Sequence, residues 1–216
     1  MSFPRFNLEY FQNSSGAERK KLSHELDQMC SDTGFVILEG HGISQKVIDD
    51  QWAIVSNFFS SSLEIKREVR VPYNGYPYGW IGPDQEALAA SKGQETPPDL
   101  KESFNGGPLI IPKNIQDPEA YDFCYQPTLW PKIDGFREIW ESYYLEMEKL
   151  AKRIMSAFAE ALDLECHYFD DFINNPISAL RALHYPETKN KIFKKQQRAG
   201  AHTDYGSLTI LLPQAE

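Results

Sequence analysis

Apolar side chains recur at helical spacing in the first third of the chain, and they predict two helices with a short strand between them. Residues 17–31 carry an apolar face of this kind, and Gly34 stands where a glycine commonly ends a helix. The short apolar run over residues 35–40 predicts a buried strand. Ser44 can cap the next helix, whose apolar stripe continues to about residue 63.

The pattern changes twice in the remaining chain. Over residues 71–131, proline and glycine recur so often that we expect loops, and an aromatic-rich loop region of this length typically covers a functional site. A long amphipathic helix is predicted over about 135–162, and it needs a broad apolar surface to pack against. A short helix ending at Pro176 follows. Strands are then predicted over 178–186 and 201–213, separated by a lysine-rich turn.

Composition narrows the class of protein. The chain has 216 residues, 41% of them hydrophobic and 13% aromatic, which is enough for a packed core. Its net charge of -9 disfavours nucleic acid or an anionic membrane as the main partner. No apolar run is long enough to span a membrane, and no secretory signal is evident, so we expect a cytoplasmic protein. Three widely spaced cysteines, Cys30, Cys124 and Cys166, indicate reduced, structural thiols.

Candidate chemistry lies near the end of the chain, where His202 and Asp204 are two residues apart. On a strand, residues at this spacing project to the same face. One imidazole and one carboxylate on one face form two corners of the facial triad that holds non-haem Fe(II). The H-x-D pattern by itself has low specificity, and its alternative is an exposed histidine and an aspartate near a turn.

The residues around this pair carry a resemblance. The segment "GAHTDYGSLTILL" resembles the metal-binding strand of the Fe(II)- and 2-oxoglutarate-dependent dioxygenases of the isopenicillin-N-synthase-like group. Further segments are similar to that family's landmarks in the same order: "DTGFVILEGHGIS", "LEIKREV", "NGYPYGW", "DLKESFNGGP", "LWPKIDGFREIWESYYLEMEKLAKRIMSAFAEALDL" and "LRALHYP".

The resemblance implies a mostly β fold with supporting helices, a distorted double-stranded β-helix or jelly roll that is incomplete at its C-terminal end. Residues 1–112 would form the N-terminal helix, strand and loop segment. Residues 113–216 would supply the long support helix and the first part of the jelly-roll core.

For the site, the resemblance implies that His202 and Asp204 are iron ligands, with 2-oxoglutarate as cosubstrate and O₂ as co-reactant. It places Tyr185 and Arg181 at the cosubstrate pocket, and their spacing puts them on one strand face together with Leu183. The alternative for Arg181 is a pairing with a structural carboxylate. His184 falls on the opposite face and is not expected to be the third ligand.

Three aromatic residues, Tyr205, Tyr73 and Phe104, are candidates for contact with the substrate. Tyr205 follows the second ligand, but strand alternation makes it face outward by default. Tyr73 and Phe104 lie in the loop region, where aromatic side chains more often pack the loop down.

The implied activity is oxidation of a small molecule, by hydroxylation or desaturation, with release of succinate and CO₂. Two alternatives stay open: an oxidase of the same fold that uses no 2-oxoglutarate, and a truncated, non-catalytic binding relative. In the family a third ligand, a histidine, follows further along the chain, and so does an R-x-S motif. We therefore expect an incomplete part or a truncated form of a longer protein. If these 216 residues are the whole polypeptide, we expect weak or no iron binding, poor solubility and no activity. The substrate and the oligomeric state stay open.

Overall fold

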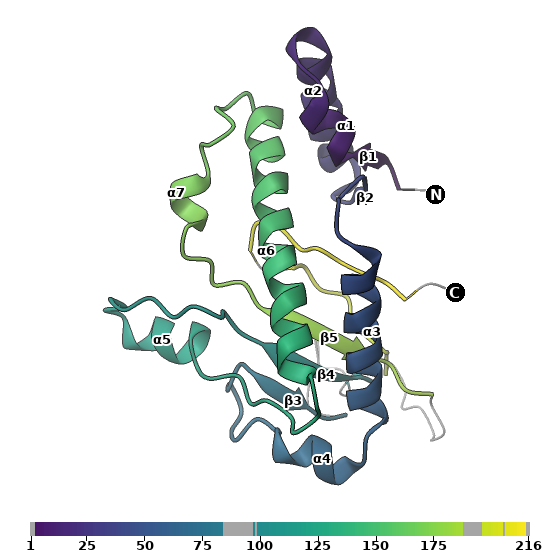
Figure 1. Ribbon diagram of the computed structural model, residues 1–216, viewed down its shortest axis with the longest axis vertical. Coiled ribbons are helices and arrows are strands. Elements are labelled where there is room, and N and C mark those ends of the chain that lie inside the picture. The colour runs from purple at the N-terminus through teal and green to yellow at the C-terminus, as the bar shows by residue number, and fades with distance from the viewer. Residues whose placement is uncertain (1–2, 84–96, 98, 188–195, 205, 215–216) are drawn as a thin grey trace. The chain divides into compact units, whose positions relative to one another are not determined.

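The structure is a computed structural model that describes residues 3–83, 97, 99–187, 196–204 and 206–214. Helices and strands follow one another along these residues as shown in Figure 1. Their order is β1 (Arg5–Asn7), α1 (Leu8–Asn13), α2 (Gly16–Thr33), β2 (Ile37–Glu39), α3 (Gln45–Ser60), α4 (Leu63–Glu68), β3 (Gly79–Ile81), β4 (Glu102–Gly106), α5 (Pro118–Cys124), α6 (Phe136–Ala161), α7 (Asp170–Ile173) and β5 (Leu180–His184).

The predicted helix, strand and helix at the start are present as α2, β2 and α3. Gly34 ends α2 in the left-handed conformation, with φ 68°, where glycine has no Cβ to cause strain. The expectation of a buried strand is wrong for β2, because Ile37 is 38% exposed. Its partner is β1, a parallel strand that the sequence pattern did not predict. A two-stranded pair leaves side chains at its surface, which explains the exposure.

The second predicted helix is present as α3, and the short helix α4 follows it without having been predicted. After α3 ends at Ser60, the side chain of Ser62 accepts a hydrogen bond from the backbone N–H of Ile65 and caps α4. Buried side chains of α3, among them Phe58 and Phe59, form the predicted apolar stripe. This stripe reaches the core from one side.

The stretch expected to be loops contains the central strand of the main sheet. β4 pairs antiparallel with β3 on one edge and with β5 on the other, and all five of its residues are buried. Its sequence, ESFNG, shows no apolar alternation, so periodicity could not identify it. Pairing on both edges satisfies its backbone groups and holds it in the sheet.

An aromatic cluster forms the core beside this sheet. Phe104 of β4 contacts Phe58 of α3 and both Phe136 and Trp140 of α6, with ring centroids 5.0 to 5.1 Å apart. Trp140 also lies against Gly106, where an added Cβ would sit 2.5 Å from its Nε1. The long predicted helix is therefore present as α6, and its first turns pack against β4.

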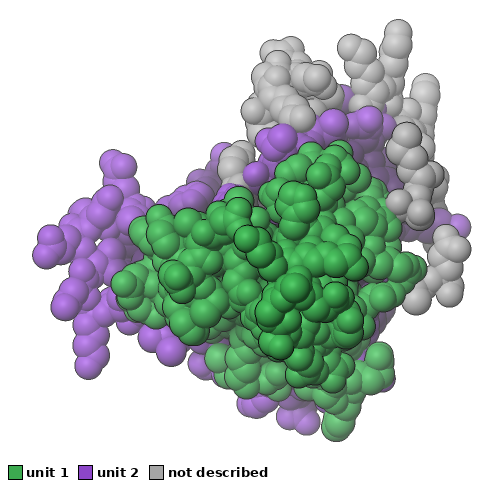
Figure 2. All heavy atoms as spheres, turned by 90° about the horizontal axis from the view of Figure 1, so that it is seen from above, with its two compact units in different colours: residues 1–48, 142–176 green, residues 49–141, 177–216 purple. Residues whose placement is uncertain are grey.

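Residue contacts divide the chain into two compact units, which Figure 2 colours separately. Unit 1 comprises residues 1–48 and 142–176, and unit 2 comprises residues 49–141 and 177–216. Each unit joins two stretches that are separate in the sequence. Unit 2 contains the main sheet, the aromatic cluster and the residues predicted for the site.

Helix prevails over strand among the described residues, which differs from the mostly β class expected. α6 has 26 residues, whereas β4 and β5 have five each. A strand needs a partner on at least one edge, and the described strands pair only as one two-stranded and one three-stranded sheet. Among the described residues, no helix is both long and apolar enough to cross a membrane.

Candidate metal centre and cosubstrate face

The main sheet presents two chemically different faces. Directly opposite residues in antiparallel strands project to the same side, and the register places Phe104 opposite Trp80 and Ala182 on the core face. The other face carries Ser103 opposite Leu183, and Asn105 opposite Arg181. This second face is named the open face for its exposed β5 residues Arg181 and Leu183, while its β4 residues Ser103 and Asn105 are buried.

Arg181 and Leu183 lie on the open face, as the predicted alternation requires. Both are exposed, while the intervening residues of β5 are partly buried. Tyr185 continues the alternation just after β5 and is 36% exposed. The guanidinium Nη2 of Arg181 donates to the hydroxyl of Ser103 at 3.2 Å, which holds the cation over the open face. The open face thus carries a cation and, just past the end of β5, a phenol.

His202 and Asp204 converge on each other. The imidazole Nε2 of His202 lies 3.4 Å from Oδ1 of Asp204, and its Nδ1 lies 2.8 Å from the carbonyl oxygen of Gly200. A carbonyl oxygen can only accept a hydrogen bond, so Nδ1 carries the proton. In the neutral ring Nε2 then presents its lone pair toward the carboxylate.

Two electron-pair donors that face each other fit a cation between them. Ligands about 2.1 Å from one divalent metal, in adjacent octahedral positions, are separated by about 3 Å, close to the 3.4 Å observed. Metal-binding histidines commonly donate their other ring N–H to a carbonyl or carboxylate, as His202 does to Gly200. The residues present therefore fit two ligands of a metal ion. No cluster of three or more metal-binding side chains occurs among the residues that the structure describes.

The predicted strand around this pair is absent from the described part of residues 201–213. His202 and Asp204 converge through local turns and hydrogen bonds, and strand alternation does not bring them together. A backbone segment becomes a strand only when a neighbour pairs with it. The predicted lysine-rich turn falls largely on residues 188–195, outside the described residues.

The segment before β4 anchors the chain that leads to His202. The backbone N–H of Leu100 donates to the carbonyl of Gln197 at 2.9 Å, and the N–H of Gly200 donates to Oδ1 of Asp99 at 3.1 Å. β4 begins at Glu102, which is paired with His184 at the end of β5. Tyr185 and the His202 segment therefore meet the same end of the sheet.

His184 lies on the core face and has a structural partner. Its Nδ1 is 2.8 Å from Oε1 of Glu102, and its ring stacks on Phe59 with centroids 5.2 Å apart. Glu102 also accepts from Nε1 of Trp80 at 2.7 Å and from Nζ of Lys66 at 3.0 Å. His184 is thus held in this buried polar network on the core face, on the opposite side of the sheet from Arg181 and Tyr185, as strand alternation predicts.

The three substrate candidates have different positions. Phe104 is fully buried in the aromatic cluster, so it has no surface for a substrate and its assignment is corrected to a core residue. Tyr73 is 55% exposed and packs edge-on against Tyr76, whose hydroxyl donates to the carbonyl of Pro127 at 2.6 Å. Tyr205 lies outside the described residues.

Sequence reasoning missed two buried charged residues next to the site. Asp99 and Lys101 are 2% and 3% exposed, and Lys101 Nζ lies 3.5 Å from Oδ2 of Asp99. Their opposite charges and their spacing of two residues, directly before a strand, could have indicated that the two side chains lie on the same side of the chain and pair with each other. Their burial had no signal in the sequence. Among the described residues, the buried Oδ1 of Asn105 has no hydrogen-bond partner.

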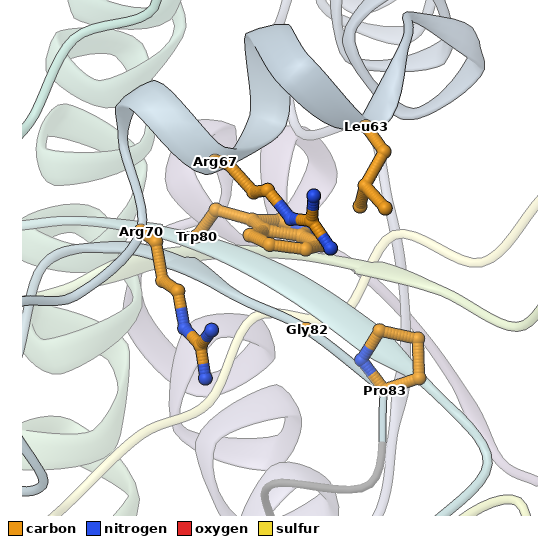
Figure 3. A pocket seen from close by; sticks show the side chains of 6 residues that line it. All are labelled: Leu63, Arg67, Arg70, Trp80, Gly82 and Pro83. Carbon is orange, nitrogen blue, oxygen red and sulfur yellow. The ribbon is translucent and has the colours of Figure 1, made fainter.

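A separate hollow of about 230 Å³ lies in unit 2. Figure 3 shows the side chains that line it. Arg67, Arg70 and Trp80 line it together with Leu63, Gly82 and Pro83. None of the residues predicted for iron, cosubstrate or substrate lines this hollow. The candidate metal site is therefore defined by the convergence of His202 and Asp204 and lies apart from this hollow's lining residues.

Comparison with known proteins gives a consistent result. The family described as the N-terminal part of the non-haem dioxygenases in morphine synthesis matches residues 3–133. A 2-oxoglutarate-dependent dioxygenase of Didymella fabae is 30% identical over 97% of this chain and 64% of its own length. The 2-oxoglutarate-dependent dioxygenase citB of Monascus ruber is 32% identical over 94% of this chain and 62% of its own.

A solved structure has a similar fold. It is a full-length protein of Neurospora crassa, crystallised in complex with alpha-KG, which is 26% identical and superimposes with a TM-score of 0.77. The similarity covers 95% of this chain and 62% of that chain. This chain thus spans between three fifths and two thirds of the length of these relatives.

Proposed function

The chain belongs to the non-haem dioxygenase family, and on that premise we propose that the protein is a 2-oxoglutarate-dependent oxygenase of a small molecule. The reaction would be a hydroxylation or desaturation with release of succinate and CO₂. The observation that carries the proposal is the convergence of His202 Nε2 and Asp204 Oδ1 at 3.4 Å, with Nδ1 held by a carbonyl.

His202 and Asp204 would hold Fe(II) as two of its protein ligands. At least one further ligand is required, and in the family it is a histidine beyond the H-x-D pair. When bound, iron supplies the oxygen chemistry together with 2-oxoglutarate and O₂. The part of this chain is to hold His202 and Asp204 in position and to present the open face beside them.

The open face supports binding of an anionic cosubstrate. The guanidinium of Arg181 can form charge-assisted hydrogen bonds with a carboxylate, and Ser103 fixes its position. Tyr185 can donate its phenol hydrogen from the end of β5 that adjoins the His202 segment. We propose Arg181 and Tyr185 as contacts of 2-oxoglutarate. Crystals of the Neurospora crassa relative that contain both alpha-KG and thymine support a small-molecule substrate.

The first experiment locates the metal on the chain. Mn(II) is a paramagnetic probe that broadens the NMR signals of nuclei near it, so it detects weak binding at an individual residue. We expect broadening of the His202 and Asp204 signals at Mn(II) concentrations that leave the rest of the spectrum sharp. His202→Gln should abolish it, because the amide provides no imidazole nitrogen.

The control is another His and Asp pair of this chain. His167 Nδ1 lies 3.0 Å from Oδ2 of Asp170, and both side chains are exposed. His167→Gln should leave the broadening at His202 unchanged. Equal broadening at both pairs, or none at His202, would contradict the proposed site. Succinate formation from 2-oxoglutarate, dependent on Fe(II) and measured on a chain that also contains the third ligand, then separates the proposed activity from an oxidase that uses no 2-oxoglutarate and from a non-catalytic relative.

A further inference from the structure

A buried carboxylate lies next to the chain segment that carries the candidate ligands. Asp99 is 2% exposed and directs its two oxygens to different partners. Oδ1 accepts the backbone N–H of Gly200 at 3.1 Å, a buried hydrogen bond, and Oδ2 faces Nζ of Lys101 at 3.5 Å. Both partners are donors, so each oxygen of Asp99 has a defined role.

The hydrogen bonds of Gly200 continue from Asp99 to the metal ligand. Gly200 is buried, and while its N–H is bound by Asp99, its carbonyl accepts from Nδ1 of His202 at 2.8 Å. The N–H and the carbonyl of Gly200 belong to adjacent peptide planes that are joined only through the φ and ψ of this buried residue, so anchoring the N–H limits the directions that the carbonyl can take. The ring orientation of His202 therefore depends on the anchor at Asp99.

We propose that Asp99 is a positioning residue for His202 and that Lys101 orients its carboxylate. Asp99 acts through Gly200, and it holds the imidazole in the tautomer that leaves Nε2 unprotonated and directed to Asp204. The inference rests on the proposed function only in naming His202 a metal ligand. The hydrogen-bond relay itself belongs to the metal-free protein.

A carboxylate suits this role because it has two acceptor oxygens. Burying a charged pair costs desolvation energy, and an apolar pair of similar volume would often be no less stable. An uncharged amide in its place has one acceptor oxygen and two N–H donors. Gly200 and Lys101 meet different oxygens of Asp99, so an amide in the same position would offer its oxygen to one of them and an N–H donor to the other. The pair thus provides a directed acceptor for Gly200 that neither an apolar residue nor an amide beside Lys101 could provide.

This difference gives a test by loss and rescue. In Asp99→Asn, the amide oxygen should turn to the Lys101 cation, since a charge-assisted hydrogen bond is the stronger one. The Gly200 N–H then loses its acceptor. In Asp99→Asn combined with Lys101→Met, the Lys101 cation no longer competes, and the same oxygen is again available to Gly200. Both changes nearly conserve side-chain volume.

Two NMR measurements on the metal-free 216-residue chain read out the relay. Hydrogen exchange of the Gly200 amide should accelerate about five- to tenfold in Asp99→Asn, as expected for one lost hydrogen bond. Proton–nitrogen correlation of the neutral His202 ring should show the proton moving from Nδ1 to Nε2. The double variant should restore both values toward those of the parent, and His202→Gln identifies the ring signals.

Three results would overturn the proposal. Asp99→Asn could leave both readouts unchanged, it could change Gly200 exchange without altering the His202 tautomer, or the double variant could fail to restore either. Exchange of β4 amides serves as the control for folding. If Asp99→Asn unfolds the chain, the double variant is compared with Asp99→Leu combined with Lys101→Met, in which residue 99 has no acceptor. Because no metal is present, failure of Mn(II) binding would count against the proposed function alone.

Discussion

Replacing Lys66 with Met should destabilise unit 2 far more than replacing Lys132 with Met. Both lysines pair with a glutamate: Lys66 with Glu102 at 3.0 Å, and Lys132 with Glu68 at 3.1 Å. The pairs differ in burial, since the side chains of the first are 13% and 5% exposed and those of the second are 87% and 48% exposed. Because the two pairs have similar distances, the same substitution in each shows how much of the stability loss comes from burial of the pair.

The magnitude follows from what remains around Glu102. Removing one partner of a buried ion pair costs about 3–5 kcal/mol, because the other charge stays buried without compensation. Glu102 retains Trp80 Nε1 at 2.7 Å and His184 Nδ1 at 2.8 Å as neighbours. These contacts place the expected loss for Lys66→Met at the lower end, about 3 kcal/mol. The exposed pair should contribute no more than about 1 kcal/mol.

Urea unfolding followed by tryptophan fluorescence measures this difference. All four tryptophans, Trp52, Trp80, Trp130 and Trp140, belong to unit 2, so the signal reports on that unit. With a urea dependence of about 2 kcal/mol per molar, a loss of about 3 kcal/mol lowers the midpoint by about 1.5 M. Circular dichroism must give the same midpoint before free energies are compared.

The reasoning fails if the two variants shift the midpoint equally, or if Lys66→Met costs less than about 1 kcal/mol. Either result would mean that Glu102 is well solvated or that its other donors suffice. In that case the network on the core face would contribute little to holding β4 and β5 together.

Two further changes test the packing around the sheet. Burial raises the pKa of Tyr78 above its usual value of 10, so the unfolded chain ionises first and stability falls as the pH rises above about 10. Tyr78→Phe should lower the urea midpoint at neutral pH, because the Tyr78 hydroxyl donates to the carbonyl of Cys124 at 2.6 Å. The variant should also lose less stability at alkaline pH. If its stability falls with pH as steeply as that of the parent between about pH 9 and pH 12, Tyr78 is not the group responsible. Gly106→Ala should cost about 1–3 kcal/mol in urea unfolding by overpacking, since its Cβ would lie 2.5 Å from Nε1 of the buried Trp140. A neutral result would show that the Trp140 ring moves freely.

Sequence patterns predicted well those helices and strands whose signals lie within a single segment of the chain. α2, α6 and α7 depend on side chains three and four residues apart and on end signals such as Gly34, all of which lie within one segment. β5 showed its alternation in "LRALH". By contrast, β4 and its buried polar residues escaped prediction, because strands distant in sequence on both of its edges determine its state.

The sequence alone indicated the family, since the H-x-D pair and the ordered segments around it resembled that family's landmarks before any fold was known. Only the tertiary structure decided how the pair is held. Asp99 and Gly200 are 101 residues apart, and their hydrogen bond forms only when the segment before β4 meets the segment before His202. Hydrogen bonds act over about 3 Å in space whatever the separation along the chain. The anchor of the candidate metal ligand therefore becomes visible only in the folded chain.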